Sequence, residues 1–425
     1  MPRNSQITRR LVVSLLAVVL LVFGLVGALA SCQAQAPDAL PRLLIVLPMP
    51  SPHGEATAYG VAHPNGWVYI VNQGGSIAIL DGPRLVTLLP WPGGKPRSGV
   101  LSGLDVDPKT GYVWVGDNVN AAVHVISGTE VITTIHNVGI RPNHLVVHPV
   151  TGLVYVSNPH GYPPEPILGA VRVISGTEVI ATLETGYVPQ VLRVHPLNQN
   201  VYVGQYASWP DNPAGGRSMG MLSVISGTTR IAQTTLGEPP TTLSAIMDIA
   251  INQTTGEFYL LQDYYALVYW DGQVDIRRIP LGKWGYIPGL SLSLNHVAVD
   301  TKRNWAYVTS WDGPPSHVVV AQKDKVIAVL EVPGYDVRDV VYDATHDYIY
   351  VANRLAGNMS IIRGTEVITT LNTGGVGPTY ITVDEERGYI YVSNADTHSI
   401  AVFGYDAPPD GQPPFWRRFL PFLRW

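Results

Sequence analysis

The chain has 425 residues, of which 42 are Gly and 35 are Pro, and charged residues make up 14% and hydrophobic residues 46% of it. This mixture is typical of many short strands joined by tight turns, and it excludes a disordered or coiled-coil chain. The formal net charge of −5 gives the protein no electrostatic reason to bind nucleic acid.

The N-terminal residues are typical of an export signal. Three basic residues (Arg3, Arg9 and Arg10) precede an apolar run from Leu11 to Ala30, and Leu-Ala-Ser-Cys follows, ending at Cys32. A charged start, an apolar core and small residues before a cleavage point mark a secretory signal. The four residues also match the bacterial lipobox, whose cysteine is lipidated. Cys32 is the only cysteine in the chain, and lipidation would remove the lone thiol that an oxidising compartment disfavours.

We therefore predict a lipoprotein signal peptide over residues 1–31, a linker over 32–40, and an extracytoplasmic protein that is lipid-anchored to the bacterial cell membrane. The alternative is an uncleaved membrane-spanning anchor, because an apolar run of about 20 residues can cross a bilayer. Both interpretations place the rest of the chain outside the cytoplasm. Cleavage removes three Arg and no acidic residue, which takes the net charge from −5 to −8.

A short marker, apolar-aromatic-apolar followed closely by a polar residue, then recurs along the chain. Its copies are VYIVN (Val68–Asn72), VWVGD (Val113–Asp117), VYVSN (Val154–Asn158), VYVGQ (Val201–Gln205), FYLLQ (Phe258–Gln262), AYVTS (Ala306–Ser310), IYVAN (Ile349–Asn353) and IYVSN (Ile390–Asn394). Successive central aromatics are 41 to 57 residues apart. Eight copies at this spacing indicate a structural repeat of about the size of a propeller blade.

Each period divides into four predicted strands. In the third period these are a strand over His144–Gly152 that runs into a turn, the marker Val154–Asn158, and strands at Ala170–Ser175 and Glu178–Glu184. The phrase VISGTEVI, at Val125–Ile132 and again at Val173–Ile180, is then a third strand, a hairpin and a fourth strand, with Gly supplying the backbone angles of the turn. Repeated units of four short antiparallel strands predict an all-β propeller. The alternative, a solenoid, would need capping ends that the sequence does not show.

The repeated YVSN and YVAN markers, together with VISGTEVI, resemble the YVTN-type β-propeller repeat family. The resemblance covers roughly residues 41–406. Members of that family usually have seven blades, so seven blades is the alternative to the eight that the repeats predict.

Ring closure is expected from the two ends of the repeat region. The last unit has three strands, the third at Ser399–Tyr405, and an unassigned strand, Arg42–Met49, precedes the first unit. We expect these two segments to pair, because pairing removes two exposed sheet edges. Both chain ends would then leave from one face of the propeller, and this face would look toward the membrane. The tail over 407–425, which ends in the aromatic and basic segment Phe415–Trp425, would add a second membrane contact; alternatively it packs on the propeller or is disordered.

Three long loops between second and third strands lie on the other face: Pro159–Gly169, Tyr206–Gly220 and Trp311–His317. Long loops on a rigid scaffold are where binding usually occurs. Trp209 and Trp311 on these loops would suit stacking on a sugar or a protein hot spot.

Polar residues are also expected at the mouth of the central channel. Residues His63, Asp107, His148, His195, Asn252, Asp300, Asp343 and Asp384 end the first strands and are interpreted as turn formers. Four positions earlier lie His144, Asp248, His296 and Asp339, and the adjoining position adds Asn143, Gln190, Asn295 and Arg338. Converging His and Asp could hold a divalent metal or polarise a substrate oxygen. The alternative is that they bind channel water or neighbouring loops.

The predicted function is a binding or scaffold module that presents its loops to a protein, peptide or glycan ligand. The alternative is an enzyme, similar to propeller lactonases or lyases, with a metal at the channel mouth. No cofactor is predicted other than that possible divalent metal. Walker, HExxH and CxxC motifs are absent from the sequence, and a propeller fold by itself hosts both functions.

Overall fold

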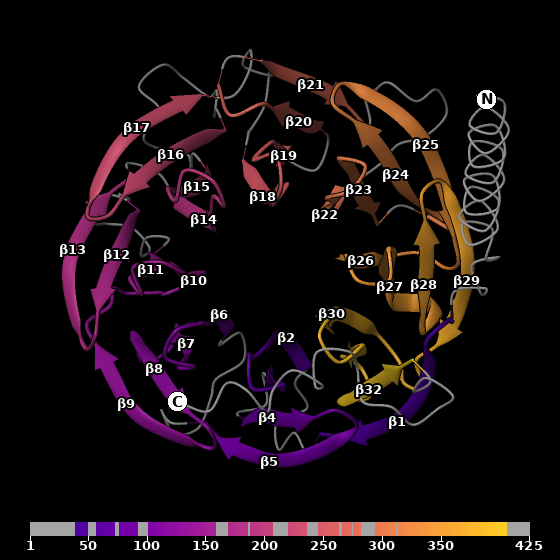
Figure 1. Ribbon diagram of the computed structural model, residues 1–425, viewed down its shortest axis with the longest axis horizontal. Coiled ribbons are helices and arrows are strands. Elements are labelled where there is room, and N and C mark those ends of the chain that lie inside the picture. Colours follow the sequence, from indigo (N-terminus) through magenta and orange to yellow (C-terminus); the bar gives the residue numbers. More distant parts are fainter. Residues whose placement is uncertain are drawn as a thin grey trace, which may run out of the picture. The chain divides into compact units, whose positions relative to one another are not determined.

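The computed structural model describes residues 39–49, 57–72, 76–91, 101–158, 169–185, 188–206, 220–235, 245–262, 266–273, 275–281, 294–311 and 313–405. In these ranges the chain forms eight antiparallel sheets of four strands each, arranged as blades around a central axis (Figure 1). The predicted eight-bladed propeller is confirmed, and the seven-bladed and solenoid alternatives are wrong. The predicted signal segment, Cys32, Trp209 and the tail at Phe415–Trp425 lie outside the described residues.

Blades are numbered here in chain order, and each runs from an inner strand at the central channel to an outer strand. Blades 1 to 4 consist of β2 (Thr57–Ala62), β3 (Trp67–Asn72), β4 (Ser76–Asp81), β5 (Arg84–Pro90); β6 (Leu101–Val106), β7 (Val113–Asp117), β8 (Ala122–Ser127), β9 (Glu130–His136); β10 (Leu145–Val147), β11 (Val154–Asn158), β12 (Ala170–Ser175), β13 (Glu178–Glu184); and β14 (Val188–Val194), β15 (Val201–Tyr206), β16 (Met221–Ser226), β17 (Thr229–Thr235). Blades 5 to 8 consist of β18 (Ile246–Ile251), β19 (Phe258–Gln262), β20 (Ala266–Trp270), β21 (Ile276–Pro280); β22 (Leu294–Asp300), β23 (Trp305–Ser310), β24 (Ser316–Gln322), β25 (Lys325–Val332); β26 (Val337–Asp343), β27 (Tyr348–Asn353), β28 (Asn358–Arg363), β29 (Glu366–Asn372); and β30 (Pro378–Asp384), β31 (Tyr389–Asn394), β32 (Ser399–Gly404), β1 (Arg42–Pro48). The only helical element in the described ranges is the short 3-10 turn η1 (Arg354–Ala356). A helix long and apolar enough to cross a membrane is not found in the same ranges.

The ring closes as predicted. Strand β1 pairs antiparallel with β32, with Arg42 opposite Gly404 and Pro48 opposite Ser399, and so supplies the outer strand of blade 8. The pairing covers an edge of β32 that would otherwise be open to association with another strand.

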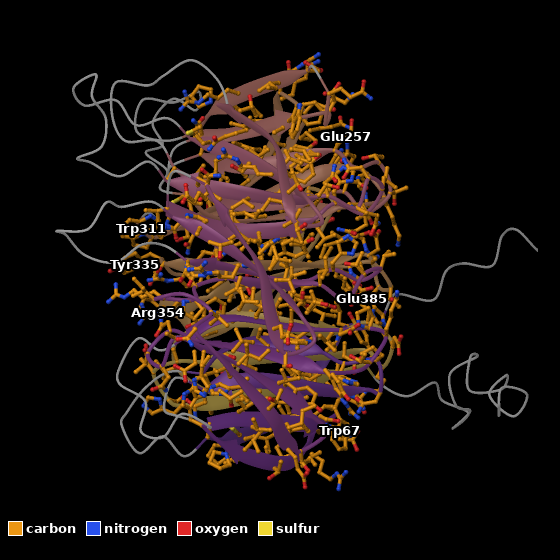
Figure 2. All side chains as sticks on the ribbon, turned by 90° about the vertical axis from the view of Figure 1, so that its left-hand side faces the viewer. Trp67, Glu257, Trp311, Tyr335, Arg354 and Glu385 are labelled. Atoms are coloured by element: carbon orange, nitrogen blue, oxygen red, sulfur yellow. The ribbon has the colours of Figure 1, made fainter. Side chains whose placement is uncertain are left out.

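Closure defines two faces. Because β32 ends where β1 begins, both ends of the propeller leave from the face that carries the loops between first and second and between third and fourth strands, which we call the closure face. The opposite face, with the loops between second and third strands and between blades, is called the loop face. Figure 2 shows Glu257 and Glu385 at the closure face, and Trp311, Tyr335 and Arg354 at the loop face.

Apolar side chains pack between blades. The described residues form eight buried clusters, and each cluster combines residues from two neighbouring blades. The cluster between blades 8 and 1 joins Val68 and Ile70 to Tyr391 and Ile400. One blade alone cannot bury its apolar faces, which is the physical reason that the unit must repeat and the ring must close.

The two repeated phrases are linked by a hydrogen bond between blades. The tyrosine hydroxyl of a marker donates to the carbonyl of the hairpin glycine in the next blade, at 2.9 Å in three places: Tyr69 to Gly128, Tyr155 to Gly227 and Tyr307 to Gly364. These glycines have φ between 56° and 60°, a left-handed conformation that a side chain would disfavour. The aromatic of the marker and the Gly of the hairpin therefore recur together because they meet across an interface.

The residues that end the inner strands are turn formers, as predicted. His63, His148 and His195 each contact a backbone carbonyl of the next blade through Nε2, at 2.6 to 3.0 Å. The aspartates at the equivalent positions accept backbone N–H groups of their own turns, as Asp343 does from Thr345, and the three histidines do the same through Nδ1. These side chains hold the closure face together and do not enter the channel site described below.

The polar residue that ends the second marker, Asp117, is fully buried on the loop-face side. Its carboxylate accepts hydrogen bonds from Trp91 Nε1 at 3.0 Å and Asn120 Nδ2 at 2.7 Å, and it contacts His124 Nε2 at 3.0 Å. Burial opposes ionisation of Asp117, but the hydrogen bonds from His124 and Asn120 outweigh it and lower the pKa to about 2. Asp117 therefore joins blades 1 and 2 as a buried carboxylate.

Outer strands are protected by bulges. In seven of the eight described outer strands the pairing shifts by one residue close to the hairpin or chain end where the strand begins. The extra residue is apolar in each case: Leu44, Val86, Ile132, Ile180, Ile231, Ile327 and Ile368. A bulge twists a strand locally and makes its edge a poor template for pairing with another chain.

Candidate functional site

Bulges in the inner strands also decide which side chains reach the channel. In seven blades the pairing between inner and second strand shifts close to the loop face. The residues that the shifts leave without a partner include Gln190, His296 and Asp339. A bulge re-aims the side chain of the extra residue, so three of the predicted polar residues owe their place to it.

A chain of polar contacts crosses four consecutive blades. Arg193 of blade 4 lies between His144 of blade 3 and Asp248 of blade 5, with Nη1 3.1 Å from His144 Nε2 and Nη2 3.0 Å from Asp248 Oδ1. His296 of blade 6 continues it, with Nδ1 3.4 Å from Asp248 Oδ2. The predicted residues His144, Asp248 and His296 are therefore brought together, through an arginine that the prediction did not include.

The carboxylate of Asp248 is saturated by protein groups. Besides Arg193 and His296, it accepts the backbone N–H of Ile249 at 2.8 Å and that of Val297, in the next blade, at 3.2 Å. An ionised carboxylate offers about four lone-pair positions, and all of them are used here.

Two other carboxylates repeat this backbone arrangement. Asp339 accepts the N–H of Val340 at 2.9 Å and that of Ile381, in blade 8, at 2.8 Å. Asp105 accepts the N–H of Val106 at 2.8 Å and that of Val147, in blade 3, at 2.7 Å. Each carboxylate thus joins its own inner strand to the next one, which is a structural role.

Burial and neighbouring charges shift the pKa values of the residues in this cluster in different directions. Burial and then the charge of Arg193 lower the pKa of His144 to about 3, so this imidazole is neutral at pH 7. Burial opposes protonation of His296, but the carboxylates of Asp248 and Asp339 outweigh it and raise its pKa. Burial likewise opposes ionisation of Asp248, which His296 and Arg193 outweigh, so its pKa is lowered.

The pKa values of Asp339 and Asp105 are shifted in the direction opposite to that of Asp248. Burial raises the pKa of Asp339, and it raises the pKa of Asp105 to about 6. The backbone N–H groups that these carboxylates accept only partly offset the loss of hydration.

These residues line a cavity of about 540 Å³ in the loop-face half of the channel, which we call the loop-side cavity. His144, Arg193, Asp248, His296 and Asp339 form one arc of its wall, and Gly60, Gly103 and Tyr380 lie on the remaining blades. A second cavity of about 500 Å³ lies toward the closure face. Its wall is mostly aliphatic, and both cavities touch Arg193.

The neighbouring residues predicted for the site divide into two groups. Asn143 and Gln190 line the loop-side cavity. Asn295 and Arg338 do not: Asn295 Nδ2 donates to the carbonyl of Val337 at 3.0 Å, and Arg338 pairs with Asp336 at 2.6 Å. These two side chains therefore lie outside the lining of the cavity, where the first residue of β26 holds Asn295 and the loop before β26 holds Arg338.

Arg193 is the site residue that the sequence reasoning missed, and Asp105 of blade 2 occupies the equivalent position of its own inner strand. Both stand two positions before a turn residue, where the other inner strands carry Val, Ala or Thr. A charged residue at that place in an inner strand is a signal that the sequence offers. Burying a charged side chain in the apolar core between blades is costly, so such a residue indicates a position that does not face this core.

The loop face also carries exposed apolar side chains. Trp311 is 48% exposed, Tyr335 46% and Leu355 50%. They lie on successive loops of blades 6 and 7, and Figure 2 shows Trp311, Tyr335 and Arg354 along the same side of the molecule. The predicted exposure of Trp311 is confirmed.

The four residues considered for a metal do not form a ligand set in the structure. Arg193 separates His144 from Asp248, and the oxygens of Asp248 and Asp339 already accept protein hydrogen bonds. Over the described part of the chain, no group of three or more His, Cys, Asp or Glu is arranged to hold a metal ion. The geometry therefore gives no support to a metal at this position.

Sequence comparisons find no relative: no protein family model and no curated protein matches the chain. Solved structures do match. The propeller of Dos1 is 10% identical, with a TM-score of 0.62 over 87% of this chain and 96% of that one. Kuenenia stuttgartiensis hydrazine synthase is 14% identical, with a TM-score of 0.51 over 85% of this chain and 97% of that one.

A catalytically inactive variant of virginiamycin B lyase from Staphylococcus aureus, solved with quinupristin, is 12% identical, with a TM-score of 0.50 over 72% of this chain and 94% of that one. At such identities the likenesses establish the fold alone. The chain is a β-propeller of eight four-stranded blades, and its function must be argued from its own residues.

Proposed function

We propose that this protein is a lipid-anchored, extracytoplasmic binding module that captures a protein, peptide or glycan partner on its loop face. The observation that carries the proposal is the exposure of Trp311, Tyr335 and Leu355 on that face. Large apolar side chains that are about half exposed and lie on successive loops of one face are typical of interaction sites, and aromatic residues dominate the energetics of such sites.

The opposite face suits attachment. The two ends of the propeller leave from the closure face, and Cys32 precedes Arg42 by only ten residues in the sequence. A lipid on Cys32 would hold the closure face toward the membrane and turn the loop face away from it. Replacing Cys32 with Ser in the full-length protein should move it from the membrane fraction to the soluble fraction of lysed cells. If the variant stays with the membrane, the lipid anchor is not what holds it there.

Partner capture is tested by comparing matched surface variants of the membrane-anchored protein. Trp311→Ala combined with Tyr335→Ala removes the aromatic pair, and Tyr112→Ala combined with Leu197→Ala removes comparably exposed side chains from the closure face. Loss of one hot-spot aromatic costs about 2 kcal/mol or more, which is about 30-fold in affinity. After crosslinking in cells, a partner of the loop face should be lost with the first pair and retained with the second; equal loss or equal retention would contradict the proposal.

An acid–base enzyme is the second candidate, and one contact favours it. His296 directs Nδ1 toward a saturated, ionised Asp248, which fixes the imidazole and leaves its other nitrogen for a substrate. His296→Gln should then abolish turnover of lactone substrates by the purified protein, whereas His136→Gln, at an exposed histidine of β9, should not change it. Absence of any turnover in a lactone panel, or turnover that persists in His296→Gln, would refute this candidate.

A further inference from the structure

We propose that the loop-side cavity is a binding site for a small oxyanion, which Arg193 and His144 hold by hydrogen bonds. The site is distinct from the partner surface at Trp311 and Tyr335, and it requires no reaction at His296.

Arg193 has hydrogen-bond donors to spare. A guanidinium group carries five N–H donors. Three are directed to His144 Nε2, to the backbone carbonyl of Leu192 and to Asp248 Oδ1, at 3.1, 3.0 and 3.0 Å. Its other two N–H donors have no partner among the residues that the structure describes, and the side chain, which is 38% exposed, lines the cavity.

His144 supplies a further donor, and its tautomer follows from Arg193. An arginine can only donate, so His144 Nε2 must accept, and the ring hydrogen of the neutral imidazole lies on Nδ1. The Nδ1 atom is buried and meets no hydrogen-bond partner within the described part of the chain. Buried donors without a partner are costly, and an oxygen atom of a ligand would satisfy this one.

The carboxylates of the cavity, in contrast, accept hydrogen bonds from the protein. Asp248 receives four protein groups. Asp339 accepts a backbone N–H on each of its two oxygens, from two different blades. The wall therefore offers free N–H donors, and protein groups already contact every oxygen of its two carboxylates, which suits a ligand that presents lone pairs and negative charge.

The arginine fork fits a carboxylate and a phosphate alike, because both present oxygen atoms at the spacing of two N–H groups. A cavity of about 540 Å³ admits a small dicarboxylate or inorganic phosphate. Both ligands are oxyanions. One experiment with two ligands, a dicarboxylate and inorganic phosphate, distinguishes between them.

The experiment measures binding of succinate and of inorganic phosphate to the purified mature chain by isothermal titration calorimetry, at constant ionic strength with chloride as the balancing ion. We expect saturable binding of at least one of the two. Arg193→Met should weaken it at least tenfold, while Arg278→Met, at an exposed arginine on β21, should leave it unchanged. Binding of succinate alone identifies a carboxylate site, and binding of phosphate alone identifies a phosphate site.

His144→Gln is the second variant, in case Arg193→Met does not fold. Its amide cannot both accept from Arg193 and place a donor where Nδ1 lies in the ring, so binding should again weaken by several-fold. Absence of saturable binding of either anion by the wild type overturns the proposal. Binding that is equally strong in His144→Gln and in every folded Arg193 variant overturns it too, because the anion would then occupy another place.

Discussion

The carboxyl group of Asp105 joins blades 2 and 3, and we predict that its contribution to the free energy of unfolding depends on pH. Replacing Asp105 with Asn tests this prediction. The two oxygens of Asp105 accept the N–H groups of Val106 and Val147. Burial raises its pKa to about 6 in the folded protein, against about 3.9 in an unfolded chain. A carboxyl whose pKa rises on folding stabilises the fold below the unfolded pKa, and this contribution is lost as the pH rises through the folded pKa.

The magnitude follows from the shift. About two pKa units correspond to at most about 3 kcal/mol between pH 4 and pH 8. An Asn side chain keeps one oxygen acceptor and loses the other, which costs about 1 to 2 kcal/mol at every pH. Asp105→Asn should therefore be less stable than the wild type by about 1 to 2 kcal/mol at pH 4.5 and equal to it, or about 1 kcal/mol more stable, at pH 8.

Urea unfolding of the purified protein, followed by tryptophan fluorescence at both pH values, measures these differences. Glu331→Gln, at an exposed carboxylate of β25, is the matched control and should change stability by the same small amount at both. The reasoning is refuted if Asp105→Asn destabilises the protein equally at pH 4.5 and pH 8, because the carboxyl would then not change its ionisation in this range.

Three further predictions concern the ring. Tyr155→Phe removes the hydroxyl that donates to Gly227 and should lower the free energy of unfolding by about 1 kcal/mol, measured with urea, whereas Tyr335→Phe at an exposed ring should not; equal effects would count against the interface bond. Because the pKa of Asp117 is lowered to about 2, its stabilisation is present above about pH 4 and lost as the pH falls toward 2. Asp117→Asn should thus cost about 2 to 3 kcal/mol in urea unfolding at pH 7 and much less at pH 2.5, and a cost that does not change with pH would contradict this assignment. Deleting residues 41–48 uncovers β32 and should produce oligomers in size-exclusion chromatography; a stable monomer would show that closure is dispensable.

The features that repeat along the sequence could be predicted from it. Alternating apolar residues and turn residues fixed the strands Ala170–Ser175 and Glu178–Glu184 with the bounds that the structure has. Counting the markers gave the number of blades, and the leftover strand at Arg42 gave the closure. These are local patterns, and each copy supports the others.

The channel site could be predicted only in part, because it depends on differences between copies. A bulge adds a residue to one strand and rotates the side chains beside it, and no periodic pattern shows where it occurs. For this reason His296 reaches the cavity while its neighbour Asn295 donates to the carbonyl of Val337, the first residue of β26 in the next blade. Arg193 acts through His144 and Asp248 of the two adjacent blades, and such a contact exists only after the ring is assembled.

Because the strand that begins at Arg42 pairs with the strand that ends at Gly404, the N-terminal strand completes the last blade and the ring of sheets has no break between its first and last blades. A short peptide joining residue 405 to residue 41, with new ends opened in the hairpin after Ser175, would give a circular permutant with the same eight sheets. Moving the opening from one hairpin to another would rotate the point of attachment around the rim by one blade at a time. The orientation of the proposed binding face above a membrane to which the chain is attached could then be varied without altering a single residue on that face.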